Sequence, residues 1–219
     1  MRPAALVVLG LVLAGCAGEV RRPPPEHYVV KAGDTLYSIS WRHNLDYHDV
    51  ARWNGIGGDY RIDVGQVLVL RPGVHPPPAA AAPPARAVPA PLPVTPAPAW
   101  SWPAEGPVFG TVTKPSGGVG LRIDGRLGSP VRAAAAGRVV YTGAGLRAYG
   151  ELVIIKHDET WLTAYGYNRE LLVHEGDAVR AGQPIAAMGL GPGNQPSLYF
   201  EIRMNGRPLD PLTQLPKRP

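Results

Sequence analysis

Hydrophobic and polar positions divide the chain into segments of different character. Residues 4–14 are almost wholly apolar, whereas residues 72–99 consist mainly of Pro and Ala and show no apolar periodicity. Residues 28–71 alternate short apolar runs with polar turns, and residues 100–219 carry runs rich in Val, Ile and Tyr that Gly interrupts every few residues. The last pattern is typical of an all-β protein. We therefore expect two folded domains, joined at 72–99 by a semi-rigid polyproline II linker.

The pattern of the first domain predicts the order strand, helix, helix, strand. An apolar run at 28–30 is typical of a short strand, and the turn after it leads into a helix with Asp34 or Thr35 as its N-cap. A second helix begins near residue 46 and ends at Asn54-Gly55, because both residue types tolerate the left-handed conformation. A turn and an apolar run at 64–70 then predict the closing strand.

The second domain is predicted to be a mostly antiparallel β-sheet. Glycine-rich turns separate its apolar runs, and we expect little helix outside residues 168–172. The predicted strands are 106–112, 119–123, 137–141, 151–157, 161–165, 184–188 and 197–204.

Charge and cysteine content narrow the range of functions. The formal net charge is +5 and the isoelectric point is near 9.5, a balance that can indicate a nucleic-acid partner. However, the basic residues form no run and alternate with acidic ones, so we expect no nucleic-acid binding. The single cysteine, Cys16, excludes an internal disulfide bond and needs a role of its own.

Cys16 ends a segment that resembles the bacterial lipobox, Leu13-Ala14-Gly15-Cys16. The apolar stretch before it is too short to span a bilayer but typical of a signal peptide. The resemblance implies a signal peptide at 1–15, acyl chains on Cys16 that anchor the protein, and a tether at 16–27. Because Ala17 rather than Asp follows, we expect the periplasmic face of the outer membrane. The alternative is an ordinary secretory signal followed by a chance cysteine.

The first domain resembles the LysM module, which binds chains that contain N-acetylglucosamine. The matching segments are 28–36, Trp53-Asn54 and 64–68. The resemblance implies a shallow groove in which backbone amides bind the acetamide group and apolar atoms meet the sugar face. The predicted groove residues are Gly33, Asp34, Thr35, Leu36, Ile62 and Gly65. For the glycines a role as turn formers is the alternative, and for Leu36 a place in the core.

The second domain resembles the M23 zinc endopeptidases of the lysostaphin type from about Trp102 onward. This resemblance implies the family's antiparallel β fold, and the agreement in order is extensive. The matching segments are Gly128-Ser129-Pro130-Val131, 136–140, 149–157, Thr163-Ala164-Tyr165, 175–185 and 198–202.

The residues that carry the chemistry of this family are replaced. Active members hold zinc with a His, an Asp four residues later and the second His of a His-x-His pair; two further histidines serve acid–base catalysis. Alignment on 128–131 gives the corresponding positions here as Gly118, Arg122, Tyr167, Ser197 and Tyr199. Gly has no donor, Arg is always cationic, and Tyr stays protonated near neutral pH. We therefore expect no catalytic residue, no metal and no cofactor, and a structural or solvated role for His157 and His174.

The overall layout resembles the NlpD/EnvC group of murein hydrolase activators. That resemblance implies a non-enzymatic activator of a periplasmic N-acetylmuramoyl-L-alanine amidase, directed by the LysM module to peptidoglycan glycan chains during cell separation. Arg122, Tyr167 and Tyr199 would then either line a groove for the amidase or fill the former zinc cavity, and the conserved outline of the groove favours the former. The alternatives are a structural tether between outer membrane and wall, and an active zinc endopeptidase.

Overall fold

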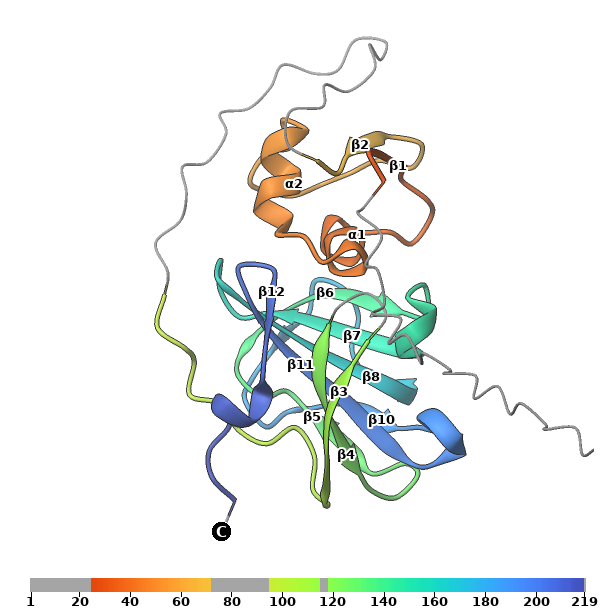
Figure 1. Ribbon diagram of the computed structural model, residues 1–219, viewed down its shortest axis with the longest axis vertical. Coiled ribbons are helices and arrows are strands. Elements are labelled where there is room, and N and C mark those ends of the chain that lie inside the picture. The colour runs from red at the N-terminus through yellow and green to blue at the C-terminus, as the bar shows by residue number, and fades with distance from the viewer. Residues whose placement is uncertain (1–24, 72–94, 115–117, 219) are drawn as a thin grey trace, which may run out of the picture.

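The computed structural model describes residues 25–71, 95–114 and 118–218, which form two domains packed against each other (Figure 1). The predicted signal peptide, Cys16 and residues 72–94 of the predicted linker lie outside these residues. Among the helices that the structure describes, none has the length and apolar character needed to cross a membrane.

The first domain has the predicted strand–helix–helix–strand order. Its elements are β1 (His27–Val29), α1 (Leu36–His43), α2 (Tyr47–Trp53) and β2 (Val67–Val69), with β1 and β2 antiparallel. Thr35 is the N-cap of α1: its side chain accepts a hydrogen bond from Ser38 N while the Ser38 side chain accepts one from Thr35 N. Asp46 caps α2 by accepting from His48 N. The reciprocal bonds at Thr35 and the single bond at Asp46 fix where the two helices begin.

The second domain is built on an antiparallel sheet of ten strands in the described residues, so the predicted mainly β fold is confirmed. Its hydrogen-bonded order is β3-β4-β11-β8-β7-β6-β9, with β10 between β5 and β8, and β12 beside β11. The strands are β3 (Val108–Thr113), β4 (Val119–Asp124), β5 (Pro130–Arg132), β6 (Gly137–Gly143), β7 (Glu151–Lys156), β8 (Trp161–Leu171), β9 (Ala178–Val179), β10 (Pro184–Met188), β11 (Ser197–Met204) and β12 (Arg207–Leu209). Three short 3₁₀ segments, η1 (Arg147–Tyr149), η2 (Pro192–Asn194) and η3 (Pro211–Thr213), complete the domain.

The helix predicted at residues 168–172 is wrong, because β8 continues through Leu171 as a strand. Leu171 and Glu170 pair with Ala186 and Ala187 of β10. The Asn168 side chain donates to the backbone oxygens of Glu151 and Tyr165, at 2.8 and 2.7 Å. Sheet pairing therefore satisfies this backbone and overrides the local polar pattern.

Strand β11 separates two hydrophobic cores because its side chains alternate between the faces of the sheet. Leu198, Phe200 and Ile202 lie in a core that belongs to the second domain alone. Tyr199 lies on the opposite face, in a core that also contains the buried residues of the first domain. One face of the sheet is therefore shared between the two domains.

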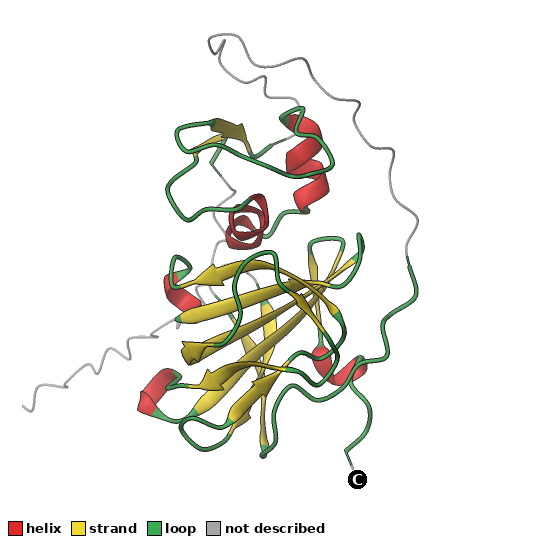
Figure 2. Ribbon diagram, turned by 180° about the vertical axis from the view of Figure 1, so that it is seen from behind, coloured by secondary structure: helices red, strands yellow, loops and turns green. Residues whose placement is uncertain are grey.

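The first domain packs on this face through α1, which lies beside β6 (Figures 1 and 2). Trp41 of α1 is buried against the guanidinium group of Arg203 on β11, whose carbon lies 3.7 Å from the Trp41 ring centroid. Arg203 Nη1 also donates to Trp41 O at 3.3 Å. A cation–π contact with a desolvated arginine stabilises such packing by about 2 kcal/mol.

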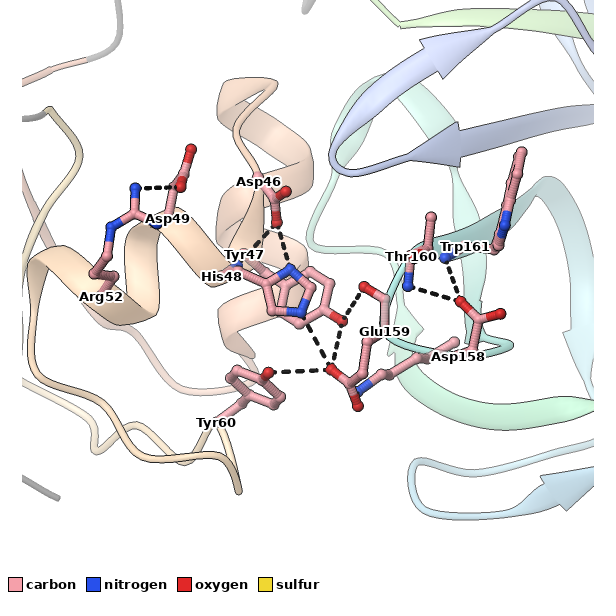
Figure 3. Close-up of polar contacts among 11 residues, drawn as sticks. Asp46, Tyr47, His48, Asp49, Arg52, Tyr60, Asp158, Glu159, Thr160 and Trp161 are labelled. Carbon is pink, nitrogen blue, oxygen red and sulfur yellow. Dashed lines mark hydrogen bonds and ion pairs between the residues drawn. The ribbon is translucent and has the colours of Figure 1, made fainter. Parts of the chain in front are cut away.

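A second contact between the domains centres on Glu159, in the turn between β7 and β8 (Figure 3). Tyr60 OH donates to Glu159 Oε2 at 3.1 Å, His48 Nε2 lies 3.1 Å from the same oxygen, and Tyr47 OH lies 3.1 Å from Glu159 O. Burial alone raises the pKa of Glu159, but hydrogen bonds and charge from Lys156, with the bonds from His48 and Tyr60, hold it below its usual value. The carboxylate thus joins α2 and residue 60 to the sheet.

Replacing Glu159 with Ala is expected to loosen the first domain without unfolding the second. The substitution removes bonds from three first-domain side chains, Tyr47, His48 and Tyr60, to a partly exposed carboxylate. We expect a loss of about 1 kcal/mol. Amide hydrogen exchange should therefore speed up in α2, and the exposed Glu170→Ala should serve as the matched control. Equal exchange of α2 in both variants would show that Glu159 does not hold the domains together.

The end of the predicted linker lies against the second domain. Thr95 Oγ1 donates to Asp158 Oδ2 at 2.7 Å, and Trp161 Nε1 donates to Thr95 O at 3.0 Å. Trp100 packs edge-on against Trp161, with ring centroids 5.8 Å apart. The described chain therefore joins the second domain from residue 95, five residues before the predicted boundary at 100.

Candidate functional site

The structure brings together the five positions that the sequence alignment predicts to correspond to the zinc and catalytic residues of the M23 family. Tyr199 on β11 pairs with Arg122 on β4 on one side and with Gly166 on β8 on the other. The Tyr167 ring lies 6.0 Å from that of Tyr199, centroid to centroid. A Cβ on Gly118 would lie 2.6 Å from Glu201 Oε2, so the loop before β4 passes directly over this strand.

Ser197 occupies the outer end of the same face. It pairs with Asp124 on β4 and is fully buried. A Cβ on Gly191 would lie 2.3 Å from Ser197 Oγ and 3.0 Å from the Tyr167 ring, so these two side chains converge beneath Gly191. All five predicted positions therefore lie around one small region of the sheet.

Lys114, which the sequence analysis did not identify, fills the centre of this region. Its Nζ lies 4.3 Å from the Tyr167 ring centroid, 4.5 Å from that of Tyr199 and 5.2 Å from that of Tyr149. The same Nζ donates to Ala148 O at 2.8 Å and to Tyr167 OH. Burial lowers the pKa of Lys114 to about 8, although the Glu201 carboxylate opposes the shift. The ammonium group is thus held by three aromatic faces.

We call the rings of Tyr149, Tyr167 and Tyr199 around Lys114 the cage. Its formation depends on local backbone geometry that the sequence motif alone does not reveal. Lys114 N donates to Gly118 O at 2.7 Å, closing the turn between β3 and β4. Tyr167 has a positive φ of 65°, which is an uncommon conformation for an aromatic residue. The backbone of Gly150 packs against Tyr167 at this point. A signal that could have identified Lys114 was its position four residues before Gly118, in a predicted turn.

Behind the cage lies a buried ion pair. Arg203 Nε donates to Glu201 Oε1 at 2.6 Å, and the side chains are 1% and 0% exposed. Tyr199 OH donates to Glu201 Oε2 at 2.6 Å. Burial, and to a smaller extent the charge of the Glu201 carboxylate, raises the pKa of Tyr199 well above its usual value. Tyr199 therefore acts as a neutral hydrogen-bond donor to Glu201.

The donor set of this site does not fit a zinc ion. A catalytic zinc needs three protein ligands, normally imidazole, thiolate or carboxylate, and an open position for water. Here the space between the tyrosines contains the ammonium of Lys114, and the permanently charged Arg122 lies beside Tyr199. Within residues 25–71, 95–114 and 118–218, no three His, Cys, Asp or Glu side chains are placed to hold a metal ion.

The two histidines of the second domain lie elsewhere. His157 Nδ1 lies 2.7 Å from Ala136 O, its Nε2 lies 2.8 Å from Thr163 Oγ1, and its ring packs edge-on against Trp100. Burial lowers the pKa of His157 to about 4, although the bond to Ala136 opposes this shift. The His174 side chain is exposed in a surface turn. His157 is thus a neutral structural group, and His174 is solvated.

The predicted partner groove needs correction at Tyr199. Its side chain is 0% exposed, because Lys114 and the rings of Tyr149 and Tyr167 pack around it, so it cannot contact another protein in this arrangement. Tyr167 is partly buried, and Arg122 lies at the rim with its side chain 17% exposed. Arg122 Nε donates to Asp124 Oδ1 at 2.9 Å, and its guanidinium carbon lies 3.4 Å from the ring centroid of exposed Phe109. The accessible part of the predicted groove is therefore its rim.

The predicted glycan groove of the first domain also needs one correction. Leu36 is 0% exposed in the domain core, so its side chain cannot meet a sugar. The other five residues are at least partly exposed, and Gly65 N donates to Val30 O at 2.8 Å, which brings the two predicted loops together. The Asp34 carboxylate accepts from Tyr28 OH and Lys31 N, and it pairs with Arg42 at 3.2 Å. Asp34 therefore braces its loop, and glycan binding by these residues stays a prediction.

Comparison with known proteins matches both domains. The sequence-family model of the LysM domain matches residues 28–71, and the sequence-family model of peptidase family M23 matches residues 116–211. The chain is 42% identical over 229 residues to the Lipoprotein NlpD/LppB homolog of Pseudomonas aeruginosa, covering 87% of this chain and 77% of that protein. It is 34% identical over 257 residues to the Murein hydrolase activator NlpD of Escherichia coli, covering 87% of this chain and 68% of that protein.

A third relative matches over a shorter region. The Outer membrane antigenic lipoprotein B of Haemophilus influenzae is 45% identical over 119 residues, which cover 54% of this chain and 29% of that protein. The resemblances to the LysM module and the M23 fold are confirmed by these matches. With both domains present and extensive identity to its relatives, the chain belongs to the NlpD/LppB lipoprotein family.

Proposed function

We propose that this protein activates a periplasmic N-acetylmuramoyl-L-alanine amidase without being an enzyme itself. The observation that carries this proposal is the ammonium group of Lys114, which lies between Tyr167 and Tyr199, two of the positions predicted to correspond to catalytic and metal-binding residues of the M23 family. The murein hydrolase activator named among the relatives supports the same role. The LysM domain would direct the protein to peptidoglycan glycan chains, and acyl chains on Cys16 would hold it at the periplasmic face of the outer membrane.

Electrostatics argues against metal-dependent cleavage at this site. Two unit charges about 4 Å apart repel by about 4 kcal/mol at an intermediate effective dielectric, and a dication doubles that value. A zinc ion between the tyrosines would face this repulsion from Lys114, without a histidine to compensate. We therefore infer that the second domain acts by binding another protein.

The accessible rim of the site suggests where the amidase binds. Phe109 on β3 is 65% exposed at the edge of the sheet, and the Arg122 guanidinium group stacks on its ring. Arginine and exposed aromatic residues commonly anchor protein interfaces. By binding the open state of the amidase more tightly than its closed state, this surface would shift the population toward the open state.

The activation is tested by release of dye from labelled peptidoglycan. The soluble chain from residue 17 onward should accelerate release several-fold with a host amidase and cause none alone. Phe109→Ala and Arg122→Ala should each reduce the acceleration, by roughly tenfold for an anchor residue that contributes more than 1 kcal/mol. Leu172→Ala, which removes another exposed apolar side chain, is the matched control.

The outcomes separate the competing functions. No acceleration with any amidase of the host would contradict activation and favour the tether between membrane and wall. In that case, deletion of the second domain should leave wall turnover and cell separation unchanged. Release of wall peptides by the chain alone would instead indicate a peptidase.

A further inference from the structure

A cleft of about 710 Å³ lies between the two domains and borders the Lys114 site at Tyr149. Its first-domain wall includes Tyr28, Lys31, Asp34 and Arg42, and its second-domain wall is the segment 145–149. Binding pockets for small ligands measure about 300–1,000 Å³, so this space suits a ligand of that size. We call it the interdomain cleft.

The interdomain cleft carries an excess of positive charge. Lys31, Arg42 and Arg147 line it, and Asp34 is its acidic residue. The Asp34 carboxylate is 7% exposed and already paired with Arg42. In the part of the chain that the structure describes, Lys31 and Arg147 have no carboxylate partner within 4.0 Å. Two cations therefore face the cleft with unmatched charge, as a site for an anionic ligand requires.

The cleft shares Asp34 with the predicted glycan groove. Lys31 and Asp34 belong to the loop between β1 and α1, and the predicted groove residues Gly33 and Thr35 lie on the same loop. A glycan on this loop would hold its substituents near Arg147 on the facing domain. Peptides attached to the wall glycan carry free carboxylates, which match unpaired arginine and lysine side chains.

We propose that the interdomain cleft binds the carboxylate-bearing peptide attached to the wall glycan. Arg147 and Lys31 contact its carboxylates from opposite domains, while the groove at Gly33 and Thr35 holds the sugar. The second domain thus contributes directly to recognition of the wall and adds selectivity for glycan that still carries its peptide. This inference rests on the wall binding proposed above and extends it.

Titration calorimetry on the soluble chain from residue 17 onward tests the cleft with two probes. One is a disaccharide-peptide released from peptidoglycan, and the other is chitotetraose, which has no peptide. The chain should prefer the disaccharide-peptide, and the preference should weaken at higher salt because charges are screened. Arg147→Gln should reduce the ratio of the two affinities by roughly tenfold, as expected for the loss of a charged hydrogen bond.

Arg180→Gln is the matched control, because Arg180 is an exposed arginine outside the cleft. Lys31→Gln should lower the affinity ratio as Arg147→Gln does, and Arg180→Gln should leave it unchanged. Equal affinity for both probes, or an equal effect of Arg147→Gln and Arg180→Gln, would contradict peptide binding in the interdomain cleft while leaving the proposed wall binding intact. Failure to bind either probe would overturn both, and the circular dichroism spectrum of each variant confirms that it is folded.

Discussion

Replacing Arg203 with Met is expected to lower the free energy of unfolding by about 3–5 kcal/mol, the usual result of removing one partner of a buried ion pair. The Glu201 carboxylate is fully buried, and Arg203 Nε lies 2.6 Å from its Oε1. Without the guanidinium group, the carboxylate would keep the hydrogen bond from Tyr199 OH and the attraction of the Lys114 ammonium, but it would lose its ion-pair partner. The substitution also removes the contact with Trp41, so the first domain should lose its packing as well.

Denaturant unfolding followed by tryptophan fluorescence measures this change. The double variant Glu201→Gln, Arg203→Met removes both charges and should recover a large part of the loss. Arg52→Met breaks the exposed pair with Asp49 and should cost less than about 1 kcal/mol. A loss below about 1 kcal/mol for Arg203→Met would contradict a structural role for this pair.

Raising the pH from 7 to 9 is expected to stabilise the protein through Lys114, by about 1 kcal/mol. The folded pKa of Lys114 is about 8, against its ordinary value of 10.5 in the unfolded chain. Between these values the unfolded chain binds more protons, so stability rises with pH. Above pH 10 the effect reverses, because burial raises the pKa of tyrosines such as Tyr199 and keeps them protonated in the folded state.

The free energy of unfolding at several pH values tests this dependence. Lys114→Met keeps the length of the side chain but removes the titrating group, so it should flatten the rise between pH 7 and 9. Lys31→Met, which changes an exposed lysine, should preserve the rise. A rise that persists in Lys114→Met would assign the effect to another group.

The fold was largely predictable because strand patterns and turn residues recur at short range. The runs at 184–188 and 197–204 coincide with β10 and β11. The error at 168–172 has a physical cause: Leu171 pairs with Ala186, a partner distant in sequence that a local pattern does not reveal. Packing between the domains was inaccessible for the same reason, since the bond from Arg203 to Trp41 spans 162 residues.

The candidate site was only partly predictable. The motif spacing located Gly118, Arg122 and Tyr199, and the structure places Tyr199 directly beside Arg122. The motif spacing could not reveal Lys114, because the position of this residue depends on the turn between β3 and β4. Nor could it decide between an exposed and a buried Tyr199, because burial depends on how tightly β4 and β8 close around the ring.

The proposed loss of metal-dependent chemistry in the M23 domain is tested most directly by its zinc content. The soluble chain is equilibrated with zinc, dialysed against a weak chelator and analysed by mass spectrometry, and the same sample is incubated with wall peptides without amidase. The lysine-filled cage predicts zinc at the background level and intact peptides. One zinc per chain, accompanied by peptide cleavage that a strong chelator abolishes, would contradict a regulator that works by binding alone.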